Sequence, residues 1–368
     1  MTAPRLEINL EKIKHNAREL QNLFSSKGIS ITAVTKGVLG SLDIVHALIE
    51  SGITSIANPY IASIRKMKEA GVDIQSMLIR PPMMSEIEEV VKYADISLNS
   101  EICTIKLLSE YALKCRKNHK VILMVEMGDL REGILPCDIE RTVEEIIDLQ
   151  GIDLIGIGAN MACLSGAKPT VKNMAELSCI AEQIQRKNGI ELEIVSGGNS
   201  ANYEWFISTD DVGLINNLRL GEAILLGCET LYRKKIPNLY TDVFTLVAEV
   251  IELKTKYSKP AGEICQDSFG NKLEFQDRGY MRRAVLGIGK QDIDISRIKP
   301  RIDTDIIGAS SDHLVLDAKE TDLRVGSEVE FDVNYSTLLK LMPSPYVEKM
   351  YFSDQPLSLE AAVKNAGK

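Results

Sequence analysis

The chain of 368 residues has few aromatic side chains, no long apolar run and no cluster of basic residues. Aromatic residues make up 5% of it, and the N-terminal MTAPRLEINLEKIKHN lacks the apolar core of a signal peptide. No stretch approaches the roughly 18 apolar residues that a transmembrane helix needs. The net charge is -9, and without clustered basic residues a row of phosphates cannot be neutralised. We therefore expect a cytoplasmic protein with no membrane and no nucleic-acid partner.

The cysteines form no recognisable motif. The seven are scattered, with no CxxC and no close pairing to histidine. This pattern favours reduced thiols and gives neither a disulfide framework nor a metal site. We expect most of them to be small buried apolar residues. His15, His46 and His119 are expected on helices or before a strand, in structural roles.

Short apolar runs alternate with amphipathic stretches from about residue 11 to residue 227. Runs such as ISITAVTKG, SIANPY and KVILMVEMG suit strands buried on both faces, and the stretches between them suit one-sided helices. Eight such units in this span predict an α/β fold, a (β/α)8 TIM barrel. An open doubly wound sheet is the alternative, but no GxGxxG opens the first unit. The segment EKIKHNARELQNLF predicts an extra helix in front of the barrel.

The pattern of apolar residues changes after about residue 234. The segments TDVFTLVAEVIELKTK, RRAVLGIG, DIIGASSDHLVLD and VGSEVEFDV are rich in Val, Ile and Thr and predict strands without helices between them. The sequence thus predicts a barrel domain over 11–235 and a second, mostly β domain over 236–368.

In a TIM barrel, the working residues lie at the carboxyl ends of the strands. Lys36 closes the first predicted strand, where burial disfavours its charge and leaves a nucleophilic amine, as a Schiff-base lysine requires. Gly37 leaves room for a ring beside it. A lysine that simply extends to solvent is the equally weighted alternative. Arg131 follows the fifth strand and Asn160 ends the sixth, although a loop arginine and a turn asparagine are ordinary alternatives.

Two glycine-containing loops follow the seventh and eighth predicted strands. The first is SGGNSAN, with Ser200, and the second lies in NNLRLGEAI, with Arg219, Gly221 and Glu222. Barrels often bind phosphate in these two loops, where helix N-termini offer free N–H groups. Two such loops and a lysine on the first strand predict a binding site for a phosphorylated aldehyde cofactor. Pyridoxal 5'-phosphate (PLP) is the obvious candidate.

Six segments in order resemble the alanine-racemase (fold type III) family of PLP enzymes, and more narrowly its ornithine-racemase-like branch. They are LEINLEKIKHN, AVTKG, VEMGDLREG, GGNSAN, LRLGEAI and GASSDHLVLD. The resemblance spans nearly the whole chain. It implies that RLEINL pairs with the C-terminal domain, which adds residues 1–10 to that domain. It also implies a head-to-tail homodimer with active sites at the interface.

The resemblance assigns roles to single residues around the cofactor ring. Lys36 falls on the Schiff-base lysine, and Arg131 falls on the arginine that contacts the phenolic oxygen. Asn160 stands where the family has a ring-contacting histidine. Arg219 falls on the arginine that faces the pyridine nitrogen, where it can only donate a hydrogen bond. The ring would then be a weaker electron sink, which restrains side reactions.

The resemblance also implies a phosphate cup and a second acid/base. The cup consists of Ser200, the N–H groups of Gly221 and Glu222, and Tyr346 in MPSPYVEKMY.

Alanine racemases take the second acid/base from a tyrosine of the partner subunit, but PAGEICQDSFGNKLEF contains none. We favour Asp267, followed by Cys265, Lys290 and Tyr280. Asp267 would need its pKa raised by burial, and a plain turn residue is the alternative.

Asp312, in ASSDHL, is the residue expected to meet a cationic substrate side chain across the dimer. On a strand, His313 would point to the opposite face. We therefore expect racemisation of a free amino acid, ornithine or another basic one. The alternatives are an alanine racemase, a PLP-dependent aldolase or decarboxylase, and a non-catalytic PLP-binding carrier or regulator.

Overall fold

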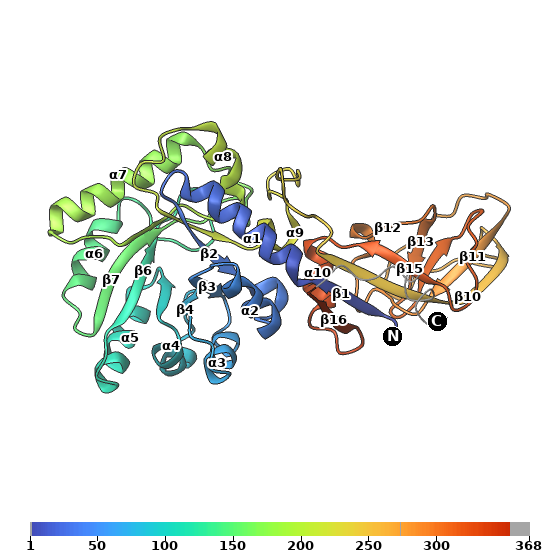
Figure 1. Cartoon of the computed structure of the whole chain (residues 1–368), viewed down its shortest axis with the longest axis horizontal. Coiled ribbons are helices and arrows are strands. Elements are labelled where there is room, and N and C mark those ends of the chain that lie inside the picture. Colours follow the sequence, from blue (N-terminus) through green and yellow to red (C-terminus); the bar gives the residue numbers. More distant parts are fainter. Residues whose placement is uncertain (1, 273, 354–368) are drawn as a thin grey trace, which may run out of the picture. The chain divides into compact units, whose positions relative to one another are not determined.

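A computed structural model describes residues 2–272 and 274–353 of the chain (Figure 1). The Cα positions divide into two compact units. One unit is Glu11–Thr241, and the other combines Met1–Leu10 with Asp242–Lys368. We describe each unit by itself.

Within Glu11–Thr241, eight parallel strands close into a barrel, which confirms the predicted TIM barrel. Closure comes from the pairing of the first strand with the last, with Thr32 beside Arg219. The strands, in barrel order, are β2 (Ser30–Val34), β3 (Ser55–Asn58), β4 (Gln75–Leu78), β5 (Ile96–Asn99), β6 (His119–Met124), β7 (Ile152–Gly158), β8 (Ile194–Ser196) and β9 (Asn217–Leu220).

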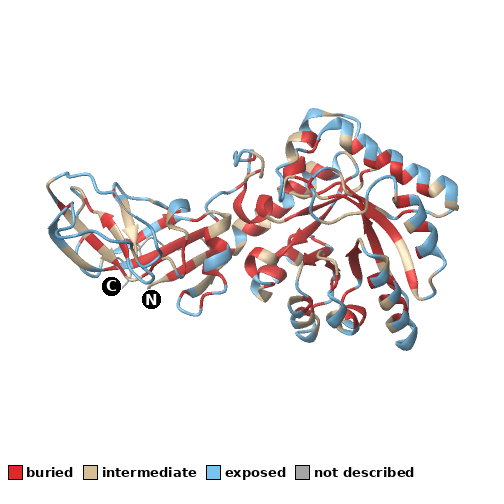
Figure 2. Cartoon of the chain, turned by 180° about the vertical axis from the view of Figure 1, so that it is seen from behind, coloured by how far each residue is buried: buried red, intermediate tan, exposed pale blue. Residues whose placement is uncertain are grey.

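Helices follow the barrel strands, and the longer ones have one buried side (Figure 2). In α6, for example, the buried residues Ile139, Val143 and Ile146 share one face at helical spacing. The expected extra helix is α1 (Leu10–Ser25). The others are α2 (Leu42–Glu50), α3 (Ile61–Glu69), α4 (Ile87–Tyr93), α5 (Ile102–Lys114), α6 (Ile139–Ile147), α7 (Val171–Asn188), α8 (Tyr203–Ser208) and α9 (Glu222–Leu226), with 3-10 turns at Lys36–Val38, Met84–Glu86 and Ser200–Asn202.

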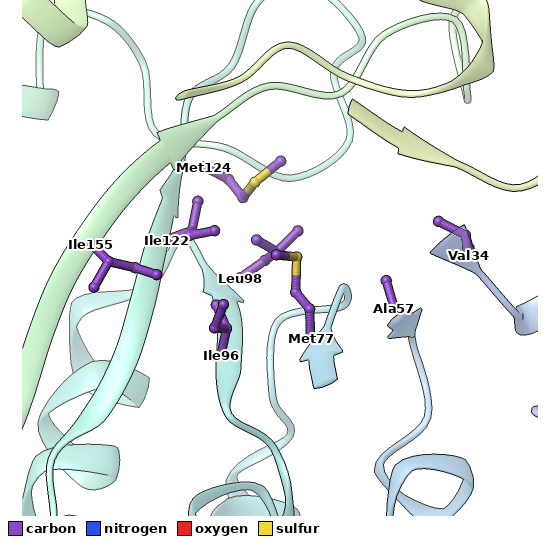
Figure 3. Packing of buried hydrophobic residues seen from close by; sticks show 8 residues of the cluster. All are labelled: Val34, Ala57, Met77, Ile96, Leu98, Ile122, Met124 and Ile155. Atoms are coloured by element: carbon purple, nitrogen blue, oxygen red, sulfur yellow. The ribbon is translucent and has the colours of Figure 1, made fainter. Parts of the chain in front are cut away.

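A cluster of buried apolar side chains from β2 to β7 fills part of the barrel (Figure 3). Every member is at most 8% exposed, so the strands are held by close packing on this face. The members are Val34, Ala57, Met77, Ile96, Leu98, Ile122, Met124 and Ile155.

The second unit is built on antiparallel strands. In its described part, the strand order is β12–β15–β10–β11–β14–β13, and β1 pairs antiparallel with β10 and parallel with β16. Arg5 of β1 is buried and forms ion pairs with Glu7 and Glu328. The strands are β1 (Arg5–Asn9), β10 (Phe244–Tyr257), β11 (Tyr280–Leu286), β12 (Lys299–Pro300), β13 (Asp305–Ala309), β14 (Leu314–Asp317), β15 (Glu328–Asp332) and β16 (Glu348–Phe352), with a 3-10 turn at Ile295–Arg297.

One element of this unit was not foreseen, and one expectation is wrong. The helix α10 (Tyr335–Leu341) follows the last of the segments expected as strands, and it begins where the Asn334 side chain accepts a hydrogen bond from the Thr337 amide. The wrong expectation concerns the cysteines. The cysteines are not buried, because they lie on the outer sides of helices and in loops. Six are exposed and one is half-buried: Cys103, Cys115, Cys137, Cys163, Cys179 and Cys265, and then Cys228.

Two kinds of feature are missing from the part of the chain that the structure describes. None of its helices is long and apolar enough to cross a bilayer. Within these same residues, no three His, Cys, Asp or Glu side chains gather as metal ligands would.

A buried polar pair joins β5 and β6. His119, the first residue of β6, is 1% exposed, and its Nε2 lies 2.8 Å from Ser97 Oγ. Asn99 Nδ2 also donates to Ser97 Oγ. Desolvation lowers the pKa of His119 from 6.5 to about 4, so the ring is neutral in the folded protein at neutral pH.

The burial of neutral His119 predicts that the folded protein becomes less stable in mild acid. As the pH falls from 6.5 to about 4, the unfolded chain binds a proton at His119 that the folded chain does not. The free energy of unfolding should therefore fall by about 3 kcal/mol over this window from this group alone. Chemical denaturation of His119→Gln should show a correspondingly flatter pH dependence than wild type. His46→Gln, at an exposed helix position, is the matched control. Equal slopes for all three proteins would contradict the assignment.

Candidate functional site

The proposed site residues of the barrel unit lie where strands end. Lys36 follows β2, Arg131 follows β6, Asn160 follows β7, Ser200 follows β8, and Arg219 lies on β9. All strands of a parallel barrel have their carboxyl ends at one edge, so these residues share that edge.

Lys36 begins the short turn after β2. Thr35 before it is buried, and its Oγ accepts a hydrogen bond from Asn58 Nδ2 at 3.1 Å, which fixes the end of the strand. Lys36 itself is half-buried. Within the described ranges, its amine has no hydrogen-bond or ion-pair partner. A lysine amine that no carboxylate holds is available for reaction with a carbonyl compound.

Arg219 is a buried cation at the same edge. Its side chain donates to the Ala159 carbonyl at 2.7 Å and to Ser196 Oγ, and the residue is 4% exposed. Desolvation lowers the pKa of Arg219 to about 10, so the guanidinium still carries its proton at neutral pH. Arg219 is therefore a fixed donor that cannot accept a hydrogen bond.

The loop SGGNSAN is held in one conformation. Gly198 has φ +143°, and a Cβ there would lie 2.3 Å from Asn202 Oδ1, so only glycine fits. Its carbonyl accepts a hydrogen bond from the Arg219 amide at 3.0 Å. Ser200 is 3% exposed, and its Oγ accepts from the Ala223 amide at 3.1 Å. The loops after β8 and β9 are thus tied together through Ser200.

The start of α9 approaches the end of β2. A Cβ on Gly221 would lie 3.2 Å from the Cβ of Val34, two residues before Lys36. The side chain of Glu222 is 9% exposed and forms an ion pair with Arg233, which leaves its role at the site to the backbone. Gly221 is therefore in close contact with the strand that leads to Lys36.

Arg131 lies in a cluster that sequence reasoning did not foresee. Its Nε and Nη2 donate to the adjacent Glu132 carboxylate, and its Nη1 donates to Cys163 Sγ at 2.8 Å. The side-chain amide of Asn160 lies 3.2 Å from both terminal guanidinium nitrogens, and with its oxygen turned toward Arg131 it would accept a hydrogen bond from each. Asp129, two residues before Arg131, is buried and was also missed. The sequence signal for this cluster was the segment GDLRE, in which carboxylates lie close to the arginine on both sides.

Tyr346 belongs to the β unit, in the segment between α10 and β16. It is 65% exposed, and its amide donates to Ser344 Oγ at 3.1 Å. Most of the residue is thus exposed.

Asp267 does not have the environment that was expected. Its carboxylate accepts hydrogen bonds from the Asn271 backbone and side chain and from the Phe269 amide, in a turn. These bonds lower the pKa of Asp267, so the expectation that burial raises it is wrong for the isolated chain. Lys290 Nζ lies 3.8 Å from Asp267 Oδ2 and 4.0 Å from the centre of the Phe269 ring. The structure thus brings two of the acid/base candidates together.

The other two candidates, Cys265 and Tyr280, are exposed. The Tyr280 ring packs against Tyr257, with ring centres 5.4 Å apart.

Asp312 lies in a turn between β13 and β14. Ser310 Oγ and Ser311 Oγ donate to its carboxylate, and His313 Nδ1 lies 3.0 Å away. His313 was expected to point to the opposite face if this segment were a strand, but β13 ends at Ala309 and β14 begins at Leu314, so His313 lies in the turn. The Lys290 amide donates to the Ser310 carbonyl at 2.9 Å, so the Asp312 turn adjoins the loop of Lys290.

The fold defines a class of barrel proteins whose sites lie at the carboxyl edge, extended by an antiparallel β unit. The chain belongs to the alanine racemase family. The family model described as "Alanine racemase, N-terminal domain" matches residues 8–228. An ornithine racemase of Acetoanaerobium sticklandii is 41% identical over 350 residues, covering 94% of this chain and 99% of the relative. A lysine racemase of Thermotoga maritima is 40% identical over 354 residues, covering 95% and 99%.

Solved structures share the fold at lower identity. An alanine racemase from Streptomyces lavendulae has a TM-score of 0.77 at 16% identity, covering 96% of this chain and 98% of the other. A D-threonine aldolase from Filomicrobium marinum has a TM-score of 0.71 at 16% identity, covering 93% and 88%. At these identities the likeness shows the fold and does not distinguish reactions.

Proposed function

We propose that this chain is a PLP-dependent racemase of a free basic amino acid, ornithine or lysine. The observation that carries the proposal is similarity of about 40% identity to an ornithine racemase and a lysine racemase over nearly the full chain. The Lys36 amine at the barrel's carboxyl edge, which has no partner among residues 2–272 and 274–353, supports it. Two alanine racemases, from Clostridium perfringens and Caldanaerobacter subterraneus, are only 27% and 25% identical to this chain over 53% and 64% of its length, which disfavours alanine as the substrate.

The residues at this edge suit PLP. Bound PLP supplies a carbonyl carbon for amine attachment and an electron-withdrawing ring. Lys36 would hold its aldehyde carbon, and Arg219 would donate to the ring nitrogen. Ser200 and the N–H groups of Gly221 and Glu222 would hold the phosphate, and Tyr346 would also reach it. Arg131 and Asn160 would contact the ring from the loops after β6 and β7.

Arg219 restrains the chemistry through its charge. Because it remains protonated at neutral pH, it keeps a donor against any ring nitrogen placed there. A ring nitrogen held against this donor would remain unprotonated, and bound PLP would then stabilise negative charge at the substrate α-carbon less. The proton removed from one face must therefore be replaced quickly from the other.

Inversion needs one acid/base on each face of the α-carbon. Lys36 would serve one face, and Asp267 of the partner subunit would serve the other. In the isolated chain, hydrogen bonds hold the pKa of Asp267 below its usual range. Burial between subunits would act in the opposite direction, because desolvation disfavours the carboxylate.

A homodimer is supported by apolar side chains that are exposed in the single chain. Large apolar patches on a surface commonly mark interfaces. Six such side chains occur in the loops that follow barrel strands, at the edge of the proposed site: Leu39, Tyr60, Met83, Met84, Leu130 and Leu164. A second copy placed over this edge would bury them and bring its own β unit to the site. Such a dimer would also place the exposed carboxylate of Asp312 opposite the charged end of a basic substrate. The seven unpaired cysteines fit a reducing compartment, and we propose the cytoplasm.

The racemase proposal predicts exchange at the α-carbon. Incubated with PLP and L-ornithine or L-lysine in D₂O, the purified protein should produce both enantiomers with deuterium at the α-carbon. Chiral chromatography with mass spectrometry measures both quantities. A protein that binds PLP and leaves every amino acid unchanged would instead be a carrier. Exchange with alanine in preference to the basic amino acids would contradict the assigned substrate.

Asp267→Asn should retain PLP absorbance and slow inversion by about a hundredfold or more, since general acid/base groups contribute this much. Asp277→Asn, an exposed aspartate with hydrogen bonds to Tyr257 and Gly279, is the matched control and should remain active. Subunits of Lys36→Ala mixed with subunits of Asp267→Asn should regain about a quarter of wild-type activity if the two residues act across the dimer. Near-normal activity of Asp267→Asn would remove it from this role.

A further inference from the structure

A buried carboxylate joins the loops after β6 and β7. Asp129 lies in the loop after β6 and is 2% exposed. Its Oδ1 accepts hydrogen bonds from the amides of Cys163, Leu164 and Ser165, each at 3.1 Å. The Ser165 hydroxyl donates to the same oxygen at 3.2 Å. Three successive amides of one loop therefore converge on one side chain of the other.

These bonds favour the charged form of the carboxylate. Burial acts to raise the pKa of Asp129, but the three backbone N–H groups outweigh it and hold the pKa below its usual range. Charge-assisted hydrogen bonds are roughly twice as strong as neutral ones. The segment around residues 163–165 is exposed and has little packing of its own, so hydrogen bonds hold it: those to the Asp129 carboxylate, and one from the Ser165 hydroxyl to the Gly128 carbonyl at 3.1 Å.

The loop that Asp129 holds carries two neighbours of Arg131. Cys163 Sγ receives a hydrogen bond from Arg131 Nη1, and the Asn160 amide lies 3.2 Å from both terminal nitrogens. Glu132 holds the opposite side of the guanidinium. Arg131 is thus fixed between a carboxylate of its own loop and two side chains of the next loop.

We propose that Asp129 is a positioning residue for the site: it holds the loop of residues 160–166 so that Cys163 and Asn160 keep Arg131 in place at the barrel edge. The inference rests on the proposed function in so far as Arg131 contacts the cofactor. Asp129 itself touches neither cofactor nor substrate in this account, and it acts through Arg131.

A second carboxylate in the same loop provides a matched control. Glu126 accepts hydrogen bonds from the Gly128 and Leu130 amides, both within its own loop. It organises the loop after β6 without reaching the loop after β7. Asp129→Asn and Glu126→Gln each replace a carboxylate by an amide of the same shape, but only the first weakens the link between loops.

The direct test is amide hydrogen exchange, which needs no bound cofactor. In Asp129→Asn, the amides of Cys163, Leu164 and Ser165 should exchange about tenfold faster than in wild type, because a charge-assisted bond becomes neutral. In Glu126→Gln these three amides should exchange at the wild-type rate. Unchanged exchange in Asp129→Asn, or equal acceleration in both variants, would overturn the proposal.

The PLP-loaded enzyme provides the second readout. Asp129→Asn should shift the absorbance maximum of bound PLP and lower kcat about tenfold, while the thermal midpoint stays within a few degrees of wild type. Glu126→Gln should change neither the spectrum nor kcat. If wild type neither binds PLP nor racemises, the proposed function fails while the exchange result still tests the role of Asp129. If wild type is active and Asp129→Asn matches it in spectrum and kcat, the positioning role is wrong.

Discussion

The pairing of β2 with β9 is the constraint on which the site depends. It closes the barrel and sets Thr32 beside Arg219, although these residues are far apart in the sequence. Closure brings the strand that carries Lys36 against the start of α9 at Gly221. A parallel open sheet would leave these two ends at opposite edges. The barrel therefore converts two distant segments into one site.

The charges at the barrel edge are held in different ways, which suits different tasks. Arg219 is buried and donates to fixed oxygens, so it cannot move to follow a ligand. Arg131 is fixed by side chains from two loops, one of which depends on Asp129. The Lys36 amine alone has no partner in the described part of the chain. Two arginines held by hydrogen bonds thus share the carboxyl edge of the barrel with one amine that can change its bonding, as preorganised sites require.

Hydrophobic periodicity predicted the barrel strands because their apolar runs are buried on both faces. It predicted the helices because their apolar residues recur on one side. It missed α10, a single short helix in a β-rich segment, whose signal was the capping residue Asn334. The sequence predicted that Lys36 and Arg219 lie at the carboxyl edge of the barrel. This was possible because the strand topology alone determines which edge a residue at a strand end reaches. The surroundings of Asp267 and the turn that pairs His313 with Asp312 depend on loop conformation, which periodicity does not report. A resemblance to a family predicts which residues occupy the site, but it does not predict the hydrogen bonds that they form.

The central claim is that the Lys36 amine is the point at which the cofactor attaches to this chain. Borohydride reduction of the PLP-loaded protein, followed by peptide mapping, tests it most directly. The account predicts one pyridoxyl group, on the peptide that contains Lys36, and a loss of that label when an amino acid substrate is added in excess before reduction. A label on another lysine, or a protein that takes up no PLP, would contradict it.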